Sequence, residues 1–185
     1  MICYGYKGGS GTASRRVQVA GESVIVGAFV QANFGRPDQL TIAGVPVGRI
    51  LNRPDDIDER GSIIAVIATD APLLPHQLKR LARRISLGVG RSGAISGHGS
   101  GDIFMAFSTA NADAQQEGER VSTAAFIPNV HLDPLFEAVI QSIDEAIVNA
   151  LIANESMSGF GGSHIRNLPH DEVIEILNRH GAMHQ

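Results

Sequence analysis

The hydrophobic positions in the first part of the chain predict three neighbouring β-strands. Residues 15–20 alternate between apolar and polar side chains, and residues 22–33 are apolar in near-continuous sequence after the turn residue Gly21. A short hairpin between these two segments is therefore expected. Residues 62–69 form a second continuous, β-branched run, which ends before Pro72. A run of this length bounded by proline is typical of a strand buried on both faces of a sheet.

Weaker strand signals occur in three other places. Residues 40–48 are apolar but contain Pro46, which favours an edge strand or an extended loop. Residues 103–108 are apolar and follow a glycine-rich turn, so we expect a strand there as well. A polar surface loop or a hairpin is expected at residues 111–120, and residues 121–127 are expected to form a final strand.

Three segments have the periodicity of amphipathic helices. Residues 75–90 begin at Pro75, which suits the first turn of a helix, and their apolar side chains recur on one face. A second helix is expected from Asp133, as its N-cap, to about residue 154, and a third over residues 168–180. The apolar stripes of the first two helices are Leu78, Leu81, Ala82, Ile85 and Val89, and Leu135, Val139, Ile143, Ala146, Ile147, Ala150 and Leu151.

Composition and charge exclude several classes of protein. The 185 residues are 43% hydrophobic and 18% charged, which suits one globular domain rather than a disordered chain. The net charge of −4 argues against a non-specific nucleic-acid surface, and no apolar run reaches the roughly 18 residues of a membrane span. Cys3 is the single cysteine, so neither an internal disulfide nor a thiolate metal cage can form. The amino terminus lacks a signal-peptide pattern, so a cytoplasmic protein is expected.

A glycine-rich segment at residues 7–14 invites comparison with a phosphate-binding loop. In such a loop Gly-Lys-Ser/Thr follows the glycines and opens a helix, whereas Lys7 precedes the glycines and a strand pattern follows them. A tight turn between two strands is the simpler interpretation. The seven histidines contain no His-Glu-x-x-His pattern. We therefore expect no metal ion and no other cofactor.

Polar residues suited to catalysis stand at the ends of the predicted strands. Ser62 lies where a charged segment, residues 52–60, enters an apolar strand, so its hydroxyl is both reachable from solvent and held in place. Ser100 and Asp102 precede the strand at 103–108, and their spacing of two makes both side chains point the same way in extended backbone. Each residue also has a purely structural interpretation, because such residues commonly end loops and cap turns.

Four segments resemble the β-aminopeptidase family, which includes the L-aminopeptidase D-amidase/D-esterases. Residues 62–75, with the helix after them, are similar to the processing site of that family. Residues 30–35, Val-Gln-Ala-Asn-Phe-Gly, are similar to the family segment whose asparagine donates to the oxyanion. Residues 99–102, Gly-Ser-Gly-Asp, resemble its second catalytic motif. A Lys-Gly-Gly-x-Gly-Thr-x-Ser-Arg segment lies near the active site in the family, and here Ser10 replaces an expected apolar residue.

The resemblance implies a chemistry for these residues. In the family the protein cuts the peptide bond before the serine, here Gly61–Ser62, and the serine becomes the new amino terminus and the nucleophile. Asn33 would then stabilise the oxyanion. Ser100 and Asp102 would support the nucleophile, although Asp102 is one methylene shorter than the glutamate of some members. The implied substrates are short peptides, amides and esters that begin with an L-, D- or β-amino acid.

The resemblance also implies a fold and a domain organisation. The family fold is of the α/β (α+β) class, a four-layer αββα sandwich that resembles the N-terminal-nucleophile hydrolases and is formed from several protomers. The chain is similar to the carboxyl-terminal half of a family member, so a single, incomplete domain is expected over residues 1–185. Cleavage would divide it into residues 1–61, the end of an α segment, and residues 62–185, the β segment. A homo-oligomer is expected, with no nucleic acid or membrane as partner.

Three hypotheses for function follow from these observations. The first is a self-processing serine aminopeptidase. The second is an inactive fragment or structural subunit that keeps the motifs but lacks the substrate pocket. The third is an acyltransferase of similar architecture, which we would expect to use threonine at the cleavage point, so Ser62 speaks against it.

Overall fold

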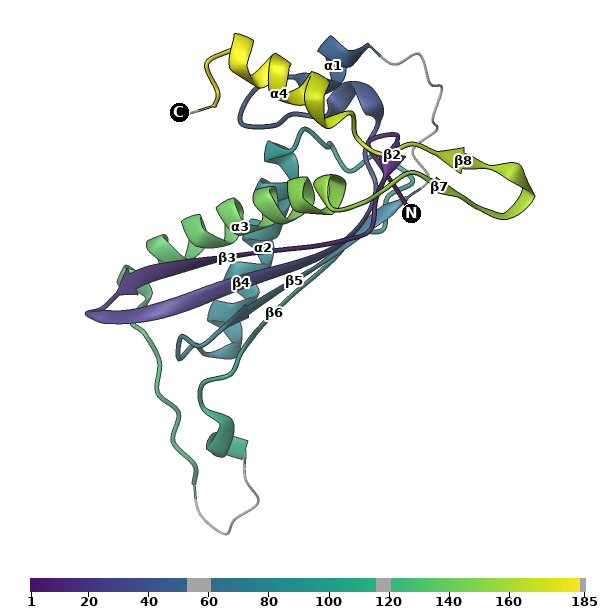
Figure 1. Ribbon diagram of the computed structural model, residues 1–185. Coiled ribbons are helices and arrows are strands. Elements are labelled where there is room, and N and C mark those ends of the chain that lie inside the picture. Colours follow the sequence, from purple (N-terminus) through teal and green to yellow (C-terminus); the bar gives the residue numbers. More distant parts are fainter. Residues whose placement is uncertain (53–60, 116–120, 184–185) are drawn as a thin grey trace.

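The computed structural model describes residues 1–52, 61–115 and 121–183, which build a four-stranded mixed β-sheet with helices on one face (Figure 1). In spatial order its strands are β3 (Ser10–Val19), β4 (Glu22–Asn33), β5 (Ser62–Thr69) and β6 (Ile103–Ser108). The pairs β3–β4 and β4–β5 are antiparallel, whereas β5 and β6 are parallel. A parallel pair needs a crossover connection, and α2 (Pro75–Arg91) provides it.

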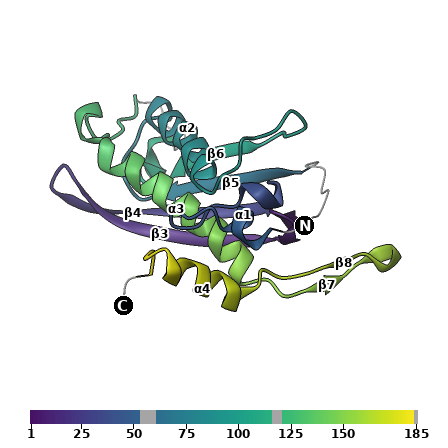
Figure 2. The same ribbon diagram turned by 90° about the horizontal axis from the view of Figure 1, so that it is seen from above.

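Two helices, α2 and α3 (Asp133–Ile152), cover one face of the sheet (Figure 2). α3 packs on β3 and β4, and α2 packs on α3 and β6. Alternate strand residues, such as Val26 and Val30 of β4 and Ile63 and Ile67 of β5, fill the space between these layers. Every residue of the apolar stripe predicted for the second helix is buried in this core. Removal of these side chains from water is the main favourable contribution to the fold.

The opposite face of the sheet is open within the part of the chain that the structure describes. Its apolar side chains, which we call the open sheet face, are exposed by 40% to 59%. They are Ile25, Phe29, Ile64, Ile103, Met105 and Phe107. The prediction that residues 62–69 are buried on both faces is therefore wrong, because the helices cover only the side of Ile63, Ala65 and Ile67.

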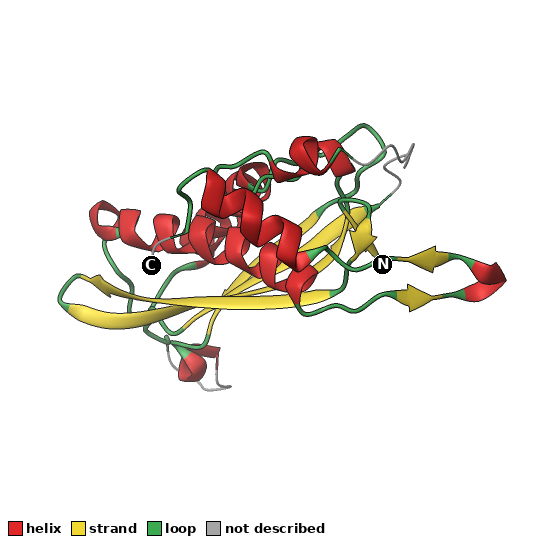
Figure 3. Cartoon of the chain, turned by 45° about the horizontal axis from the view of Figure 1, so that its top comes forward, coloured by secondary structure: helices red, strands yellow, loops and turns green. Residues whose placement is uncertain are grey.

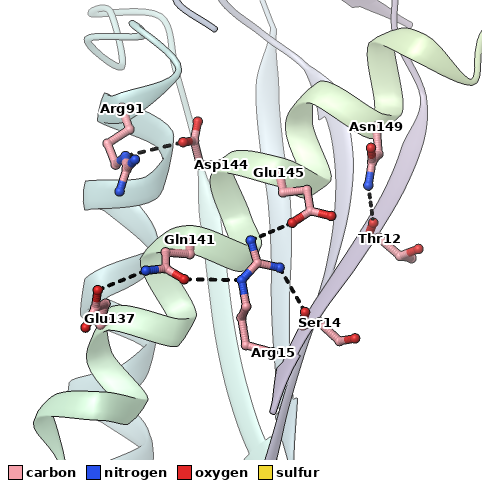
Figure 4. A network of polar contacts seen from close by, with 9 residues as sticks. All are labelled: Thr12, Ser14, Arg15, Arg91, Glu137, Gln141, Asp144, Glu145 and Asn149. Atoms are coloured by element: carbon pink, nitrogen blue, oxygen red, sulfur yellow. Dashed lines mark hydrogen bonds and ion pairs between the residues drawn. The ribbon is translucent and has the colours of Figure 1, made fainter. Parts of the chain in front are cut away.

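Polar contacts join β3 to α3 and α3 to α2 at the margin of the core (Figure 4). The guanidinium of Arg15 on β3 lies 2.6 Å from the Glu145 carboxylate and donates to the Gln141 side chain at 3.2 Å. Arg91 of α2 forms an ion pair with Asp144 at 3.3 Å. These contacts hold the partly exposed edges of the two helices in register with the sheet.

Shorter elements surround this core. They are β1 (Ile2–Cys3), β2 (Tyr6–Lys7), α1 (Val47–Leu51), β7 (Met157–Ser158), β8 (His164–Ile165) and α4 (His170–Arg179), with 3₁₀ helices at Pro37–Gln39, Ala112–Gln115, Asn129–His131 and Phe160–Gly162. β1 and β2 form one small hairpin, and β7 and β8 form another that extends away from the body of the protein (Figure 3). Within the described ranges, none of the helices combines the length and apolar character needed to cross a membrane.

Most of the predicted elements are confirmed. The strands at 22–33, 62–69 and 103–108 have the predicted bounds, and the hairpin turns at Ala20 and Gly21. The helix predicted from residue 75 ends one residue later than expected, at Arg91. The other two helices also form, although the last one starts at His170 rather than at residue 168.

Four predictions about local structure are wrong. Ser10 begins β3, so the glycine-rich turn expected over residues 7–14 is shorter than predicted. The edge strand or extended loop predicted over residues 40–48 ends at Pro46, because Val47 begins α1. Residues 121–127 form no strand, and Leu132 rather than Asp133 occupies the N-cap of α3. Most of the charged segment at 52–60 lies outside the described residues.

Candidate active site

The four residues predicted to carry out catalysis meet at the end of the sheet where β4 ends and β5 begins. The amino terminus lies at the same end (Figure 1). Ser62 is the first residue of β5 and pairs with Asn33, the last residue of β4. The loop between α2 and β6 brings Ser100 and Asp102 to the other side of β5. The site therefore lies where the central strand begins, between its two neighbours.

Ser62 is half-buried, and its hydroxyl faces the loop that precedes β6. Its Oγ accepts a hydrogen bond of 2.9 Å from the backbone N–H of Gly101. Ser62 lies on the same side of β5 as Ile64, so the hydroxyl is on the margin of the open sheet face. The position combines a fixed oxygen atom with access from that face.

Gly61, which precedes the serine, lies against the end of β4. A Cβ atom added to Gly61 would lie 1.8 Å from the Asn33 carbonyl oxygen and 2.9 Å from its Nδ2 atom. No side chain fits there without separating the two strands. The peptide bond between Gly61 and Ser62 is thus held next to the Asn33 side chain.

The amide of Asn33 has a defined orientation. Its Oδ1 atom accepts a hydrogen bond of 2.9 Å from the backbone N–H of Ile2. Because Oδ1 is occupied in this way, Nδ2 is the atom on the side of Gly61. An N–H donor that is already oriented can stabilise a developing negative charge without reorganisation.

The Asp102 carboxylate accepts three hydrogen bonds from residues that the structure describes. Its Oδ1 atom receives the Ser100 hydroxyl at 2.5 Å and the backbone N–H of Ile63 at 3.1 Å. Its Oδ2 atom receives the Ser96 hydroxyl at 2.8 Å. The Ile63 N–H therefore donates to the Asp102 carboxylate instead of to a backbone carbonyl of β6. The parallel pairing of β5 and β6 begins one residue later, at Ile64 and Ile103.

Sequence reasoning missed four of the groups that form this site. They are the backbone N–H groups of Ile2, Ile63 and Gly101 and the hydroxyl of Ser96. Backbone donors leave no signature in the identity of a residue. Ser96 could have been found only from the turn conformation, because its φ of +48° lies in the left-handed region that serine rarely adopts.

The glycine-rich segment at residues 7–14 serves close packing near this site. A Cβ atom on Gly8 would lie 2.5 Å from the carbonyl oxygen of Ala32, next to Asn33. A Cβ atom on Gly11 would lie 2.0 Å from the carbonyl oxygen of Ala146 in α3. A strand rather than a helix follows the glycines, so the segment lacks the helix that opens after a phosphate-binding loop.

Other reactive groups near the site contribute little to it. The Cys3 thiol is fully buried, and burial raises the pKa of this thiol far above its ordinary range, against a smaller opposing effect of the Phe34 backbone. A thiol in that state is a poor nucleophile. Within residues 1–52, 61–115 and 121–183, no three His, Cys, Asp or Glu side chains gather in a way that could hold a metal ion.

Two curated proteins are similar to almost the whole chain. The β-peptidyl aminopeptidase BapA of Sphingosinicella microcystinivorans is 46% identical over 196 aligned positions, which cover 97% of this chain and 50% of the relative. The β-peptidyl aminopeptidase BapA of Sphingosinicella xenopeptidilytica is 39% identical over 194 positions, covering 96% and 48%. The chain thus spans about half the length of the curated relatives that it matches.

Solved structures show the same relationship. The L-aminopeptidase D-Ala-esterase/amidase of Ochrobactrum anthropi, described as a variant of the Ntn hydrolase fold, superposes with a TM-score of 0.92 at 45% identity, over all of this chain and 51% of its own. The PH0078 protein of Pyrococcus horikoshii OT3 gives 0.89 at 44% identity, over 98% and 50%. A Burkholderia β-aminopeptidase gives 0.84 at 40% identity, over 97% and 51%. The chain has this α/β fold, and because the model of peptidase family S58 matches residues 1–165, it belongs to that family.

Proposed function

We propose that the chain carries the nucleophile of a self-processing serine aminopeptidase, with Ser62 as the catalytic residue. The observation that supports this best is the position of the Ser62 hydroxyl, 2.9 Å from the Gly101 N–H and opposite Asn33 at the end of β4. A nucleophile, an oriented amide donor and a supported carboxylate are the parts that acyl transfer requires.

Self-cleavage is the first step of the proposed mechanism. The Ser62 oxygen attacks the carbonyl carbon of Gly61, the hydroxyl proton passes to the peptide nitrogen, the peptide C–N bond breaks, and the acyl group moves to the hydroxyl oxygen as an ester. Water then opens the ester, which leaves a carboxylate on Gly61 and a free amine on Ser62. The absence of a Cβ lets the Gly61 backbone lie against Asn33, whose Nδ2–H is proposed to donate a hydrogen bond to the oxyanion of the intermediate.

The freed α-amine of Ser62 then acts as the general base. A free amino terminus has an ordinary pKa of about 7.7–8.0, so an appreciable fraction is neutral near pH 7 to 8. The amine accepts the hydroxyl proton while the oxygen attacks the carbonyl carbon of the substrate. The protonated amine next donates to the leaving amine, and water hydrolyses the acyl-enzyme to regenerate the hydroxyl. Asn33 stabilises both tetrahedral intermediates.

Ser100 and Asp102 hold the nucleophile in place. Asp102 fixes the N–H of Ile63, the residue directly after the serine, at 3.1 Å. Ser100 donates to the same carboxylate oxygen at 2.5 Å. After cleavage, this carboxylate is proposed to accept a hydrogen bond from the Ser62 amine and so to keep the amine beside the hydroxyl.

The proposed substrates are short peptides, amides and esters with a free amino-terminal L-, D- or β-amino acid. The names of the relatives, β-peptidyl aminopeptidase and L-aminopeptidase D-Ala-esterase/amidase, support this class. The relatives are about twice as long as the matched region, and the open sheet face lies beside Ser62. We propose that polypeptide equivalent to the rest of these relatives covers that face as the second sheet of the αββα sandwich and completes the substrate pocket. The whole enzyme is proposed to be a homo-oligomer.

The first experiment is the intact mass of the purified chain under denaturing conditions. Self-cleavage gives two masses, those of residues 1–61 and 62–185, and Ser62→Ala gives one uncut chain. Hydrolysis of an amino-acid p-nitroanilide is measured on the same samples, and on the chain mixed with the first half of a relative. Activity retained by Ser62→Ala would overturn the assignment of the nucleophile.

The second candidate is an inactive fragment or structural subunit with the same fold. The open sheet face favours this candidate, because a substrate bound beside Ser62 would have protein on one side only. An uncut chain that stays inactive after addition of the first half of a relative would support this alternative. An acyltransferase would instead transfer the acyl group to an added amine in preference to water, which analysis of the products would reveal.

A further inference from the structure

We propose that Ser96 is a positioning residue, which orients the Asp102 carboxylate and through it the nucleophile Ser62. This inference rests on the proposed function, because it concerns the same site. Its basis is the hydrogen bond of 2.8 Å from the Ser96 hydroxyl to Oδ2 of Asp102, across the turn that precedes β6.

The Ser96 hydroxyl occupies the one carboxylate oxygen that the other two donors leave free. The Ser100 hydroxyl and the Ile63 N–H both donate to Oδ1 of Asp102. Two donors on Oδ1 alone leave the orientation of the carboxylate plane about the Cβ–Cγ bond only partly fixed. A third donor on Oδ2 fixes the plane, so that Oδ1 stays within reach of Ile63 and Ser100.

The backbone at Ser96 is held in an unfavourable conformation that makes this contact possible. Its φ of +48° is left-handed, which is unfavourable for a residue with a Cβ. The start of the same loop is anchored separately, since the Thr41 N–H donates to the Ser92 carbonyl at 2.9 Å and a Cβ on Gly93 would lie 1.8 Å from the Gln39 carbonyl oxygen. Backbone strain of this kind is found preferentially at functional sites.

Two contacts transmit the position of Asp102 to Ser62. Oδ1 of Asp102 accepts the N–H of Ile63, which is bonded directly to Ser62, and the N–H of Gly101, the residue before Asp102, donates to the Ser62 Oγ at 2.9 Å. A displaced carboxylate would therefore disturb the serine on both sides. Ser96 itself is exposed, so its hydroxyl contributes little to the stability of the core.

A pair of substitutions separates the hydroxyl from the backbone conformation. Ser96→Ala and Ser96→Gly both remove the hydrogen bond, but glycine also relieves the left-handed strain. We expect both to slow self-cleavage and to lower kcat by roughly tenfold, the size of one hydrogen bond to a charged group, with little change in KM. The melting temperature of Ser96→Gly should equal or exceed that of Ser96→Ala. Ser86→Ala is the matched control, because it removes an exposed serine hydroxyl of α2 that donates to the Arg83 carbonyl within the same helix.

A double-mutant cycle tests whether Ser96 acts through the carboxylate. In an Asp102→Ala background, Ser96→Gly should cause no further loss of rate, since the group that it orients has already gone. If the losses from the two substitutions multiply, Ser96 does not act through Asp102 and the inference is wrong. Equal rates for Ser96→Gly and the unsubstituted chain would also overturn it.

Amide hydrogen exchange at Ile63 gives a readout that requires no catalysis. In a Ser62→Ala background, Ser96→Gly should accelerate exchange of the Ile63 N–H by about tenfold and leave Ile67, farther along β5, unchanged. Unchanged exchange at Ile63 would contradict the inference. If Ile63 responds while the chain with Ser62 neither cleaves itself nor hydrolyses substrate, the proposed function fails and the positioning contact stands.

Discussion

The Oδ1 atom of Asn33 accepts a hydrogen bond of 2.9 Å from the backbone N–H of Ile2, which lies 31 residues earlier in the chain. This contact determines which end of the side-chain amide faces Gly61. The amino-terminal hairpin thus contributes to the site without supplying a side chain.

Replacement of Asn33 by alanine or by aspartate should remove the N–H donor to the oxyanion. Alanine also removes the acceptor for the Ile2 N–H, whereas aspartate keeps it. Asn33→Ala should lower kcat/KM for an amino-acid p-nitroanilide by roughly 10²–10³, the usual loss for one oxyanion donor. Asn33→Asp keeps the volume and the acceptor for Ile2 but replaces the donor with a carboxylate oxygen, so we expect at least as large a loss with little change in melting temperature. An Asn33→Asp chain that cleaves itself at the original rate would remove this residue from the mechanism.

Substitution of Gly61 by alanine should block self-cleavage. The added Cβ would lie 1.8 Å from the Asn33 carbonyl oxygen, so the ends of β4 and β5 must move apart and the peptide bond leaves its position beside Nδ2. The free energy of unfolding should fall by about 1–3 kcal/mol, which is typical of overpacking. Gly27→Ala is the control, because a Cβ there would lie 3.8 Å from the Ala68 carbonyl oxygen in the same ladder. Gly27→Ala should be cut normally, and intact-mass measurements distinguish the two chains.

The stability of the fold should depend on the charge of Asp144. Burial raises the pKa of the Asp144 carboxyl above its usual range, with the Arg91 charge opposing this effect and Glu145 adding to it. A pKa that is higher in the folded state means that stability is greatest below the usual aspartate range and is lost as the pH rises through the raised pKa. Asp144→Asn should therefore resist urea better than the unsubstituted chain at neutral pH, and the difference should vanish in acid.

The matched control for Asp144 is Glu175→Gln. Glu175 pairs with Arg179 at 3.4 Å on α4, and both side chains are largely exposed. Exposed pairs of this kind contribute about 0–1 kcal/mol, so this variant should unfold close to the unsubstituted chain throughout the pH range. If Asp144→Asn were instead less stable at neutral pH, the ion pair with Arg91 would outweigh the effect of burial.

Two glycine substitutions should change stability in opposite directions. In Gly11→Ala the new Cβ would lie 2.0 Å from the Ala146 carbonyl oxygen, so β3 and α3 must separate and about 1–3 kcal/mol should be lost. Gly90 lies in α2 with nothing within 4 Å of an added Cβ, and Gly90→Ala should stabilise the helix by about 0.5–1 kcal/mol. Urea unfolding measures both, and a loss of stability in Gly90→Ala would contradict the packing described for α2.

The sequence predicts the centre of this fold well because its strands have clear ends. The strand at residues 22–33 lies between Gly21 and a turn, and the strand at 62–69 lies between Gly61 and Pro72. The start of β3 was missed because its inward residues there, Gly11 and Ala13, are small and give no apolar signal. Small residues at these positions let β3 lie close to α3, and this packing is visible only in the tertiary structure.

Residues 121–127 show why a strand cannot be predicted from propensity alone. The segment is apolar enough for a strand, but the backbone N–H of Ala125 donates to the Asn111 side chain and that of Ile127 to the Pro72 carbonyl. A β-strand forms only where an adjacent strand supplies a series of backbone hydrogen-bond partners. The same reasoning applies to the site: side chains at strand ends could be proposed from sequence, whereas the backbone donors at Ile2, Ile63 and Gly101 depend on which loops meet there.

The position of Ser62 at the start of the central strand has a consequence for folding. β3 and β4 precede the proposed cut, whereas β5, β6, α2 and α3 follow it, and the two groups share one hydrogen-bonded sheet and one core. Before cleavage, folding is a unimolecular reaction whose rate does not depend on protein concentration. After cleavage, the same structure must reassemble from two separate chains, so refolding becomes bimolecular and dilution opposes it. Once the cut protein has unfolded, it would therefore regain its native structure only slowly at low protein concentration.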